Sequence, residues 1–292
     1  MIEFLHAIRE QSFLQVALLT GLLASVACGM VGSYVVVRRI TYLAGGIAHC
    51  VLGGLGAARY LAVVYGWSWL HPLIGAVVAA LLAAVIIGYV SLRARQREDT
   101  VIGAVWAIGM ALGVLFIART PGYQVDLMSY LFGSILMVTS KELWLLVGLD
   151  VLVVAVGLVF YHPLLAVCFD EEFARLRGLQ VELYYILLLC LTALTVVLLV
   201  SVVGIVMVIA LLTLPVAVAG HFCKTLWQLM LVSALLSMIL TTAGLALSYG
   251  PDLPAGATTI LLAGLVYVLV MLAGRLPRGR SGRAPRATST GT

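Results

Sequence analysis

The chain has 292 residues, of which 63% are hydrophobic and 10% are charged, and its formal net charge is +5. Its mean hydropathy of +1.17 excludes a water-soluble globular domain, which needs a much more polar surface. The basic residues fall in short joints between apolar runs and are not interleaved with aromatic residues, so no nucleic acid partner is expected. The composition therefore predicts an integral membrane protein surrounded by membrane lipid.

The apolar runs predict helices. A bilayer core is about 30 Å thick, so a helix that rises about 1.5 Å per residue crosses it in roughly 20 residues. A membrane barrel would instead show strands of alternating apolar and polar residues. The fold class is therefore all-α, a polytopic integral membrane helical bundle. The predicted crossings are residues 12–36, 42–64, 70–92, 100–118, 142–161, 183–203, 204–219, 225–248 and 256–274.

The runs predict eight or nine transmembrane helices. Run 204–219 is short and contains Pro215, so it is interpreted either as a full membrane crossing or as a broken, partial one. Segment 119–141 has a Pro-Gly turn and only a brief apolar patch. This pattern favours an interfacial or re-entrant helix over a further crossing.

The distribution of positive charge favours nine crossings. With nine, thirteen of the 17 lysine and arginine residues fall on one side and four on the other. Because positive residues gather in cytoplasmic loops, the first side is expected to be cytoplasmic. The N-terminus then lies outside and the C-terminus inside. Residues 1–278 are predicted to form a single transmembrane domain, and residues 279–292 a basic disordered cytoplasmic tail.

The second run contains an ionisable side chain, His49. Such a residue is costly in a membrane unless it faces protein or water, and a neutral imidazole binds transition metals well. His49 therefore reads either as a ligand on a transport path or as a histidine bonded to a neighbouring helix. On a helix, the side chain of Cys50 points about 100° away from that of His49, so Cys50 is interpreted as a packing residue. Close helix packing is predicted by the glycines at Gly45, Gly46, Gly53, Gly54 and Gly56.

Residues 162–185 form an amphipathic joint on the predicted cytoplasmic side. Carboxylates open a short helix and arginines approach its end, which is the order that the helix dipole favours. These residues are Asp170, Glu171, Glu172, Arg175 and Arg177. Gly178 is the expected helix stop. The joint is either an ordinary solvated helix or a docking element for a cytoplasmic partner.

Two further features interrupt the apolar pattern. Gly204, Pro215 and Gly220 break residues 201–225, as in the discontinuous helices of transport paths or in a simple kink. Asp150 lies in the middle of a run and indicates a polar path or, by preference, an interhelical hydrogen bond.

Motifs for ATP binding and catalysis are missing from the sequence. There is no G-x-x-x-x-G-K-[S/T] loop, no H-E-x-x-H pair and no serine–histidine–acid set. The five cysteines form no C-x-x-C pair. The chain is therefore not expected to be an enzyme, and no resident cofactor is predicted.

Six segments, in order along the chain, resemble the membrane permease subunits of metal-ion ABC importers, which carry zinc, manganese or iron. They are V-x-R-R-x-x-Y-L-x-G-x-x-A-H-x-x-L-x-G at 36–54, E-D-T-x-I-G at 98–103, D-L-M-S-Y-L-F-G-S-I-L at 126–136, F-D-E-E-F-A-R-x-x-G at 169–178, V-G-I-V-M-V-I-A-L-L-T-L-P-V-A-V-A at 203–219 and L-S-Y-x-x-D-L-P-A-G-A at 247–257.

The resemblance implies a permease domain over residues 1–278, placed as a homodimer in a bacterial or archaeal cytoplasmic (inner) membrane. It also implies an extracytoplasmic metal-binding protein and a separate cytoplasmic ATP-binding subunit. That subunit is expected to dock on the helix at 169–178, and the coupling residues implied are Glu171, Glu172, Phe173, Arg175 and Gly178. His49 matches the family's membrane histidine, which is expected to meet the metal in transit.

The chain departs from the family pattern at Gly46, where the family usually has an aspartate three residues before the histidine. Either the path uses one ligand fewer or another residue substitutes. The A-H-x-x-L-x-G form resembles zinc-type members more than manganese-type ones, so zinc is favoured, with manganese and iron as alternatives. The alternative function is an ion-coupled secondary transporter, which would need several intramembrane acids, and only Asp150 is evident.

Overall fold

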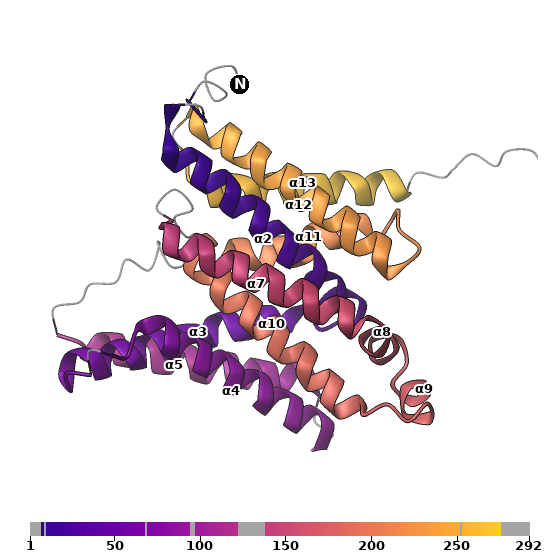
Figure 1. Cartoon of the computed structure of the whole chain (residues 1–292), viewed down its shortest axis with the longest axis horizontal. Coiled ribbons are helices and arrows are strands. Elements are labelled where there is room, and N and C mark those ends of the chain that lie inside the picture. Colours follow the sequence, from indigo (N-terminus) through magenta and orange to yellow (C-terminus); the bar gives the residue numbers. More distant parts are fainter. Residues whose placement is uncertain are drawn as a thin grey trace, which may run out of the picture.

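The computed structural model describes residues 7–8, 10–67, 69–93, 97–121, 138–251 and 253–275, and every regular element within them is a helix (Figure 1). The predicted all-α class is confirmed. In chain order the helices are α2 (Ser12–Val37), α3 (Thr41–Val64), α4 (Pro72–Arg93), α5 (Glu98–Arg119), α7 (Ser140–Val159), α8 (Tyr161–Phe169), α9 (Glu171–Leu176), α10 (Val181–Val203), α11 (Ile205–Ala219), α12 (Leu226–Tyr249) and α13 (Ala255–Arg275).

Within the described residues, eight helices are long and apolar enough to cross a bilayer. The short run predicted at 204–219 is the 15-residue helix α11, which at about 1.5 Å per residue is roughly 22 Å long. Gly204 alone separates α11 from α10, and its φ of 91° is a conformation that glycine adopts without strain. Gly204 is thus the only residue between the two helices, and the described residues form eight long helices and the three short ones α8, α9 and α11.

The two ends of the bundle differ in charge. The ends of α2, α4 and α13 lie at the same end as α8, α9 and the start of α10, on the right of Figure 1. We call this the basic end; its described basic side chains are Arg38, Arg39, Arg93, Arg97, Arg175, Arg177 and Lys224. The opposite end carries Arg59, Arg119 and Lys141. The predicted tail at 279–292 and most of segment 119–141 lie outside the described residues.

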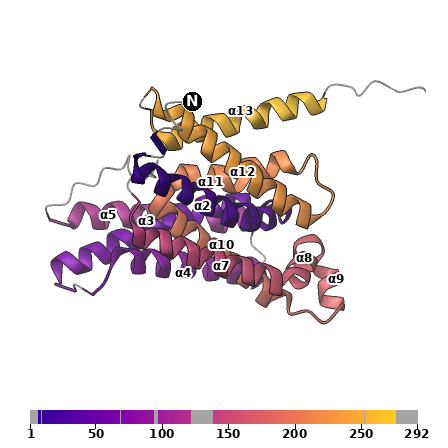
Figure 2. The same cartoon turned by 45° about the horizontal axis from the view of Figure 1, so that its top comes forward.

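The core lies around α2, α10 and α11, between α13 at one edge of the bundle and α4 toward the other (Figure 2). Several buried hydroxyls donate to a carbonyl one turn earlier, as Ser25 does to Gly21 at 2.6 Å. Between α2 and α12 the hydroxyl of Ser233 donates to the carbonyl oxygen of Gly29 at 3.1 Å. Such bonds hold helices together where lipid supplies no hydrophobic drive.

Helices α3 and α5 approach to backbone contact. A Cβ atom on Gly53 would lie 2.7 Å from the carbonyl oxygen of Gly109, so neither helix leaves room for a larger residue there. A Cβ atom on Gly109 would lie 2.8 Å from Sγ of Cys50. The predicted close packing of this segment is confirmed, and Cys50 is a packing residue between the two helices.

Candidate functional site

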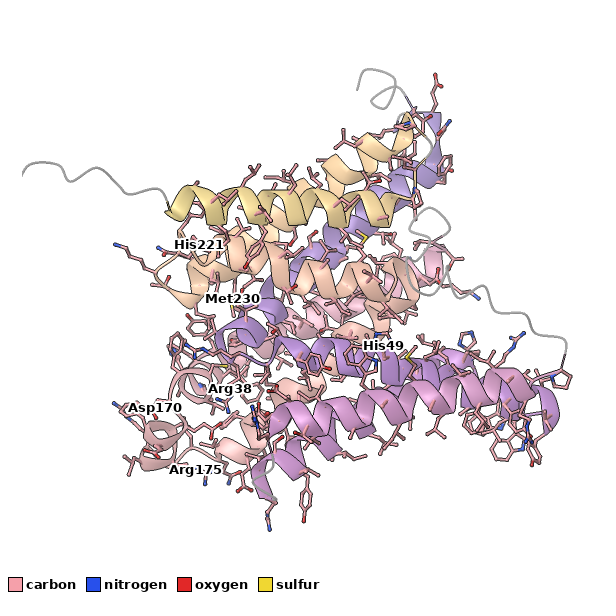
Figure 3. All side chains as sticks on the ribbon, turned by 180° about the vertical axis from the view of Figure 1, so that it is seen from behind. Arg38, His49, Asp170, Arg175, His221 and Met230 are labelled. Carbon is pink, nitrogen blue, oxygen red and sulfur yellow. The ribbon has the colours of Figure 1, made fainter. Side chains whose placement is uncertain are left out.

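His49 lies midway along α3, away from the basic end, as its label in Figure 3 shows. Its imidazole stacks on the indole of Trp106 from α5, with ring centroids 4.6 Å apart and planes inclined by 8°. Trp106 also packs against the ring of Tyr42, 5.4 Å between centroids. Among the described residues no hydrogen bond reaches the His49 ring nitrogens. Within that part of the chain, the interpretation of His49 as a histidine bonded to a neighbouring helix finds no support.

An open groove of about 710 Å³ runs along α5 beside this stack. Tyr42 and Trp106 line it together with a mostly small and apolar stretch of α5, namely Gly103, Ala107, Met110, Ala111, Val114, Leu115 and Ala118. The face of α5 turned away from α3 is exposed, with Ile108 60% exposed and Leu115 54%. The groove therefore forms an accessible surface close to the imidazole.

One protein ligand is all that α3 offers in this region. Within the described residues no three His, Cys, Asp or Glu side chains come together so that they could hold a metal ion. A lone neutral imidazole leaves the other coordination positions to water or to a second chain.

The position of the family's aspartate is closed by α5. A Cβ atom on Gly46 would lie 2.6 Å from Cγ2 of Ile102. That methyl group is attached directly to a branched Cβ, so it cannot swing away freely. No described carboxylate takes the aspartate's place beside His49. The sequence left two explanations open for Gly46: a path with one ligand fewer, or another residue in place of the aspartate. The first explanation fits this geometry.

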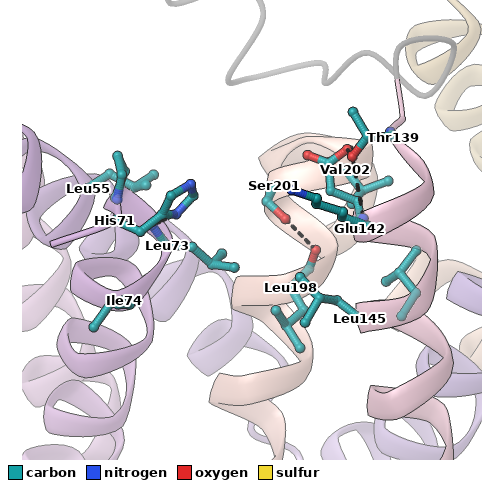
Figure 4. A pocket seen from close by; sticks show the side chains of 13 residues that line it. Leu55, His71, Leu73, Ile74, Thr139, Glu142, Leu145, Leu198, Ser201 and Val202 are labelled. Atoms are coloured by element: carbon teal, nitrogen blue, oxygen red, sulfur yellow. Dashed lines mark hydrogen bonds between the residues drawn. The ribbon is translucent and has the colours of Figure 1, made fainter. Parts of the chain in front are cut away.

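A second cavity, of about 550 Å³, lies at the opposite end between α3, α4, α7 and α10 (Figure 4). Leucines make up much of its wall, and its polar rim includes Thr139 and Glu142. These two satisfy each other, because the Thr139 backbone N–H donates to Oε2 of Glu142 at 2.7 Å and its hydroxyl donates to the same oxygen at 2.9 Å. They form a capping box for α7 and do not make an ion site.

The predicted docking helix is present as α9, at the basic end. Asp170 caps it, since its carboxylate accepts a hydrogen bond from the Phe173 backbone N–H at 3.0 Å. Ala174 is fully buried and anchors α9 to the bundle. Gly178 follows the helix with a φ of 77°, which explains why the chain stops here with glycine.

Helix α9 exposes apolar side chains to solvent, and charged side chains surround them. Phe173 is 48% exposed and Leu176 is 87% exposed. The guanidinium carbon of Arg177 lies 4.9 Å from the centroid of the Phe173 ring. Glu172 and Arg175 are also exposed. Sequence reasoning missed Leu176, although an isolated leucine within a charged joint was the available signal.

Glu171 differs from its neighbour Glu172, because it turns toward the bundle. It forms an ion pair with Arg38 at the end of α2. The Arg38 guanidinium carbon also lies 5.4 Å from the centroid of the Tyr185 ring on α10. Glu171 therefore ties α9 to the membrane helices, a role that the sequence did not reveal.

The remaining residues singled out in the sequence lie elsewhere. Asp150 is buried in α7 against α2, where the backbone N–H of Ala27 interacts with its carboxylate, in agreement with the interhelical hydrogen bond expected from the sequence. Its Oδ2 atom has no hydrogen-bond partner among the described residues. Pro215 lies inside α11 without ending it. In α8, burial raises the pKa of Cys168 to about 12, so this thiol stays neutral. The structure brings none of these residues to His49.

Comparison with known proteins agrees with the motifs. The family model described as "ABC 3 transport family" matches residues 10–274, a range that includes all six motif segments. The chain is 40% identical over 249 residues to a probable metal transport system membrane protein of Chlamydia pneumoniae, with 85% of each chain covered. It is 32% identical over 266 residues to the manganese transport system membrane protein MntC of Halalkalibacterium halodurans, covering 91% of this chain and 89% of the relative.

A solved structure is similar over almost the whole chain. It is described as PsaBC from Streptococcus pneumoniae in complex with Fab, and the match has a TM-score of 0.80 and 30% sequence identity. The match covers 93% of this chain and 95% of that chain. The resemblance carried by the motifs is thus confirmed over the full helical bundle: this chain belongs to the ABC 3 transport family.

Proposed function

We propose that the chain is the membrane-spanning permease subunit of an ABC importer for a divalent metal ion. His49 carries this proposal, because it is a stacked imidazole with both ring nitrogens unbonded among the described residues, beside an open groove and among apolar helices. Family membership and relatives named as metal transport proteins support it. The neutral imidazole would replace part of the ion's water shell and then release the ion.

A separate subunit supplies the ATP hydrolysis in this proposal. The chain has no phosphate-binding loop, and α9 offers Phe173 and Leu176 as exposed apolar anchors for a docked ATP-binding subunit. The positive-inside rule assigns the basic end to the cytoplasm. The opposite end then receives the ion from an extracytoplasmic metal-binding protein.

The working unit is a homodimer that closes across the α5 groove. The small residues of the groove, Gly103, Ala107, Ala111 and Ala118, leave room for a second helix, and the groove lies next to the stack of His49 on Trp106. One chain supplies a single ligand within its described residues, and a second copy would add another imidazole. Two imidazoles completed by water would still form a weak site.

Two arguments bear on the cargo. An imidazole without a neighbouring carboxylate suits zinc, whereas manganese prefers carboxylate, carbonyl and water oxygens. The relative named as a manganese transport protein, at 32% identity, supports manganese instead. We therefore propose a divalent transition metal ion as the cargo. Competition between zinc and manganese for uptake would show which of the two ions is transported.

Reconstitution tests the proposal. Vesicles that contain the chain, its ATP-binding subunit and its metal-binding protein are expected to import zinc or manganese only with ATP. His49→Ala should lower uptake by about tenfold or more, as for loss of a metal ligand, while the ATP-binding subunit still co-purifies. His162→Ala is the matched control, since His162 lies in α8 outside the predicted crossings. Uptake driven by the purified chain alone without ATP would refute the proposal and favour an ion-coupled secondary transporter.

A further inference from the structure

At the basic end, a continuous set of side-chain contacts joins four helices. Glu171 of α9 pairs with Arg38 at the end of α2. Arg38 lies over the ring of Tyr185 from α10, with 5.4 Å from the guanidinium carbon to the ring centroid. The Tyr185 hydroxyl donates to Oε1 of Glu98, in the first turn of α5, at 3.0 Å. We call the set Glu171, Arg38, Tyr185 and Glu98 the relay.

The relay is centred on a buried ring and is partly shielded from solvent. Tyr185 is 1% exposed, and the side chains of Arg38 and Glu171 are 23% and 30% exposed. Charge-assisted bonds in such surroundings are shorter and stronger than those on an open surface. Losing one member leaves its partner unsatisfied, which costs more than the bond itself contributed. The four side chains therefore hold one another in place.

Helix α5 connects the relay to the metal ligand. Trp106 follows Glu98 by eight residues, about 12 Å along the helix, and stacks on His49. Helices α3 and α5 touch through their backbones at Gly53 and Gly109, so neither can yield by compressing side chains there. A displacement of the first turn of α5 therefore moves the indole against the imidazole.

We propose that the relay is the mechanical link between α9 and His49, and that Tyr185 and Glu98 are positioning residues for the metal ligand. The inference rests on the proposed function, in which α9 is the docking site of the ATP-binding subunit. When that subunit shifts α9, Glu171 moves Arg38, and the planar guanidinium moves the Tyr185 ring. The Tyr185 hydroxyl then displaces Glu98 together with α5, and Trp106 opens or closes the imidazole toward the groove.

Two conservative substitutions test the link. Tyr185→Phe removes the donating hydroxyl and keeps a ring beneath Arg38. Glu98→Gln keeps an acceptor oxygen but removes its charge, which weakens the bond from Tyr185. The matched controls are Tyr184→Phe, on the same helix, and Asp99→Asn, an exposed acid in the same first turn. ATP hydrolysis and metal import are measured together for the full complex in vesicles.

The two relay variants should import about tenfold fewer ions per ATP hydrolysed, which corresponds to about 1.4 kcal/mol of lost coupling. ATP hydrolysis and co-purification of the ATP-binding subunit should stay near wild type, and both controls should keep the wild-type ratio. A proportional fall in hydrolysis and import would mark a merely structural role and overturn the relay. A normal ratio in both variants would overturn it as well.

A second measurement needs no cargo. Melting temperatures of the purified chain are compared for Tyr185→Phe, Glu171→Gln and the double variant. Members of one network are expected to be non-additive, whereas independent sites add. Additive effects would refute the relay whether or not the complex imports metal. Failure of the wild-type complex to import metal, combined with non-additive melting, would instead refute the proposed function and leave the relay intact.

Discussion

Trp106 holds the His49 ring by stacking instead of by a hydrogen bond. Stacked aromatic pairs contribute about 0.5–1.5 kcal/mol beyond the area that they bury, which is enough to bias the orientation of a ring. A histidine held by a hydrogen bond has one nitrogen committed, and only the other can bind a metal. Stacking therefore orients the imidazole and leaves either nitrogen free to be the unprotonated one that binds an incoming ion.

Replacing Trp106 tests this role at the level of one side chain. Trp106→Leu should lower the rate of metal uptake by about fivefold, because roughly 1 kcal/mol of stacking is lost, and Trp106→Phe should keep most of the rate. Trp144→Leu is the control, since Trp144 is 73% exposed on α7. Equal rates for the leucine and phenylalanine variants at position 106 would contradict a stacking role.

Gly46 allows a second prediction about a single residue. Gly46→Asp should destabilise the chain by about 1–3 kcal/mol, because the new Cβ atom would overlap Ile102. Adding Ile102→Ala should recover stability and place a carboxylate beside His49. Manganese should then compete better with zinc for uptake. Melting in detergent and metal competition are the measurements, and a double variant no more stable than Gly46→Asp alone would contradict the packing argument.

The sequence identified His49 but not Trp106. An ionisable side chain stands out in an apolar run, whereas a tryptophan looks like part of the membrane surface. Which residue of α5 meets the imidazole depends on the register of α3 against α5, set by contacts such as Gly53 on Gly109. No local sequence pattern predicts that register. For the same reason, the sequence showed that glycine replaces the family's aspartate at Gly46, but it did not show that Ile102 of α5 occupies the space.

Among the elements, α9 depends most on its surroundings. Six residues are too few for a helix that is stable in isolation. The cap from Asp170, the buried Ala174 and the ion pair of Glu171 with Arg38 hold it against the bundle. Helix α9 therefore keeps an exposed apolar surface and remains attached to the helices that it is proposed to move.

Truncating this apolar surface should weaken docking. Phe173→Ala and Leu176→Ala should each reduce the affinity for the ATP-binding subunit by about tenfold, since burying such a side chain is worth roughly 1.5–3 kcal/mol. Leu183→Ala is the control, because Leu183 is comparably exposed but lies on α10. Affinity is measured with the purified partners in detergent. Unchanged binding for both α9 variants would contradict the docking surface.

Element positions were largely predictable, since a long apolar run has little alternative to a helix in lipid. The run predicted at 42–64 corresponds to α3 (Thr41–Val64) and the run at 225–248 to α12 (Leu226–Tyr249). The run at 142–161 corresponds to α7 (Ser140–Val159), and the joint predicted from residue 162 begins where α7 has ended. Helix α8 (Tyr161–Phe169) within that joint was not predicted as an element of its own, because its residues are as apolar as the crossing before them.

At the scale of the whole molecule, the gathering of positive charge at one end was predictable because it follows from counting residues along the chain. The surface through which two copies would meet was not predictable. An exposed apolar helix face in a membrane protein contacts lipid or another helix equally well, so neither composition nor periodicity distinguishes the two. The groove on α5 is the surface that we propose for the second copy, because Gly103, Ala107 and Ala111 leave room in it for another helix.

Filling the groove should therefore prevent dimer formation. Ala111→Trp places a large side chain in the groove and should shift the purified protein to a monomer. Leu261→Trp is the control, because Leu261 is 75% exposed on α13 at the edge of the bundle. Mass measurement in detergent distinguishes the two states. A dimer that survives Ala111→Trp would mean that the copies meet through another surface.

No described carboxylate stands beside His49 to hold a divalent ion in place, and an ion that passes this side chain in the proposed cycle carries two positive charges across the membrane. One elementary charge gains about 2.3 kcal/mol on crossing 100 mV, and a doubly charged ion gains about 4.6 kcal/mol. Import should therefore be electrogenic, and an inside-negative voltage should assist it. Abolishing the voltage with an ionophore should slow uptake at constant ATP, so cells with a depolarised membrane would take up the metal more slowly even when their nucleotide pool is full.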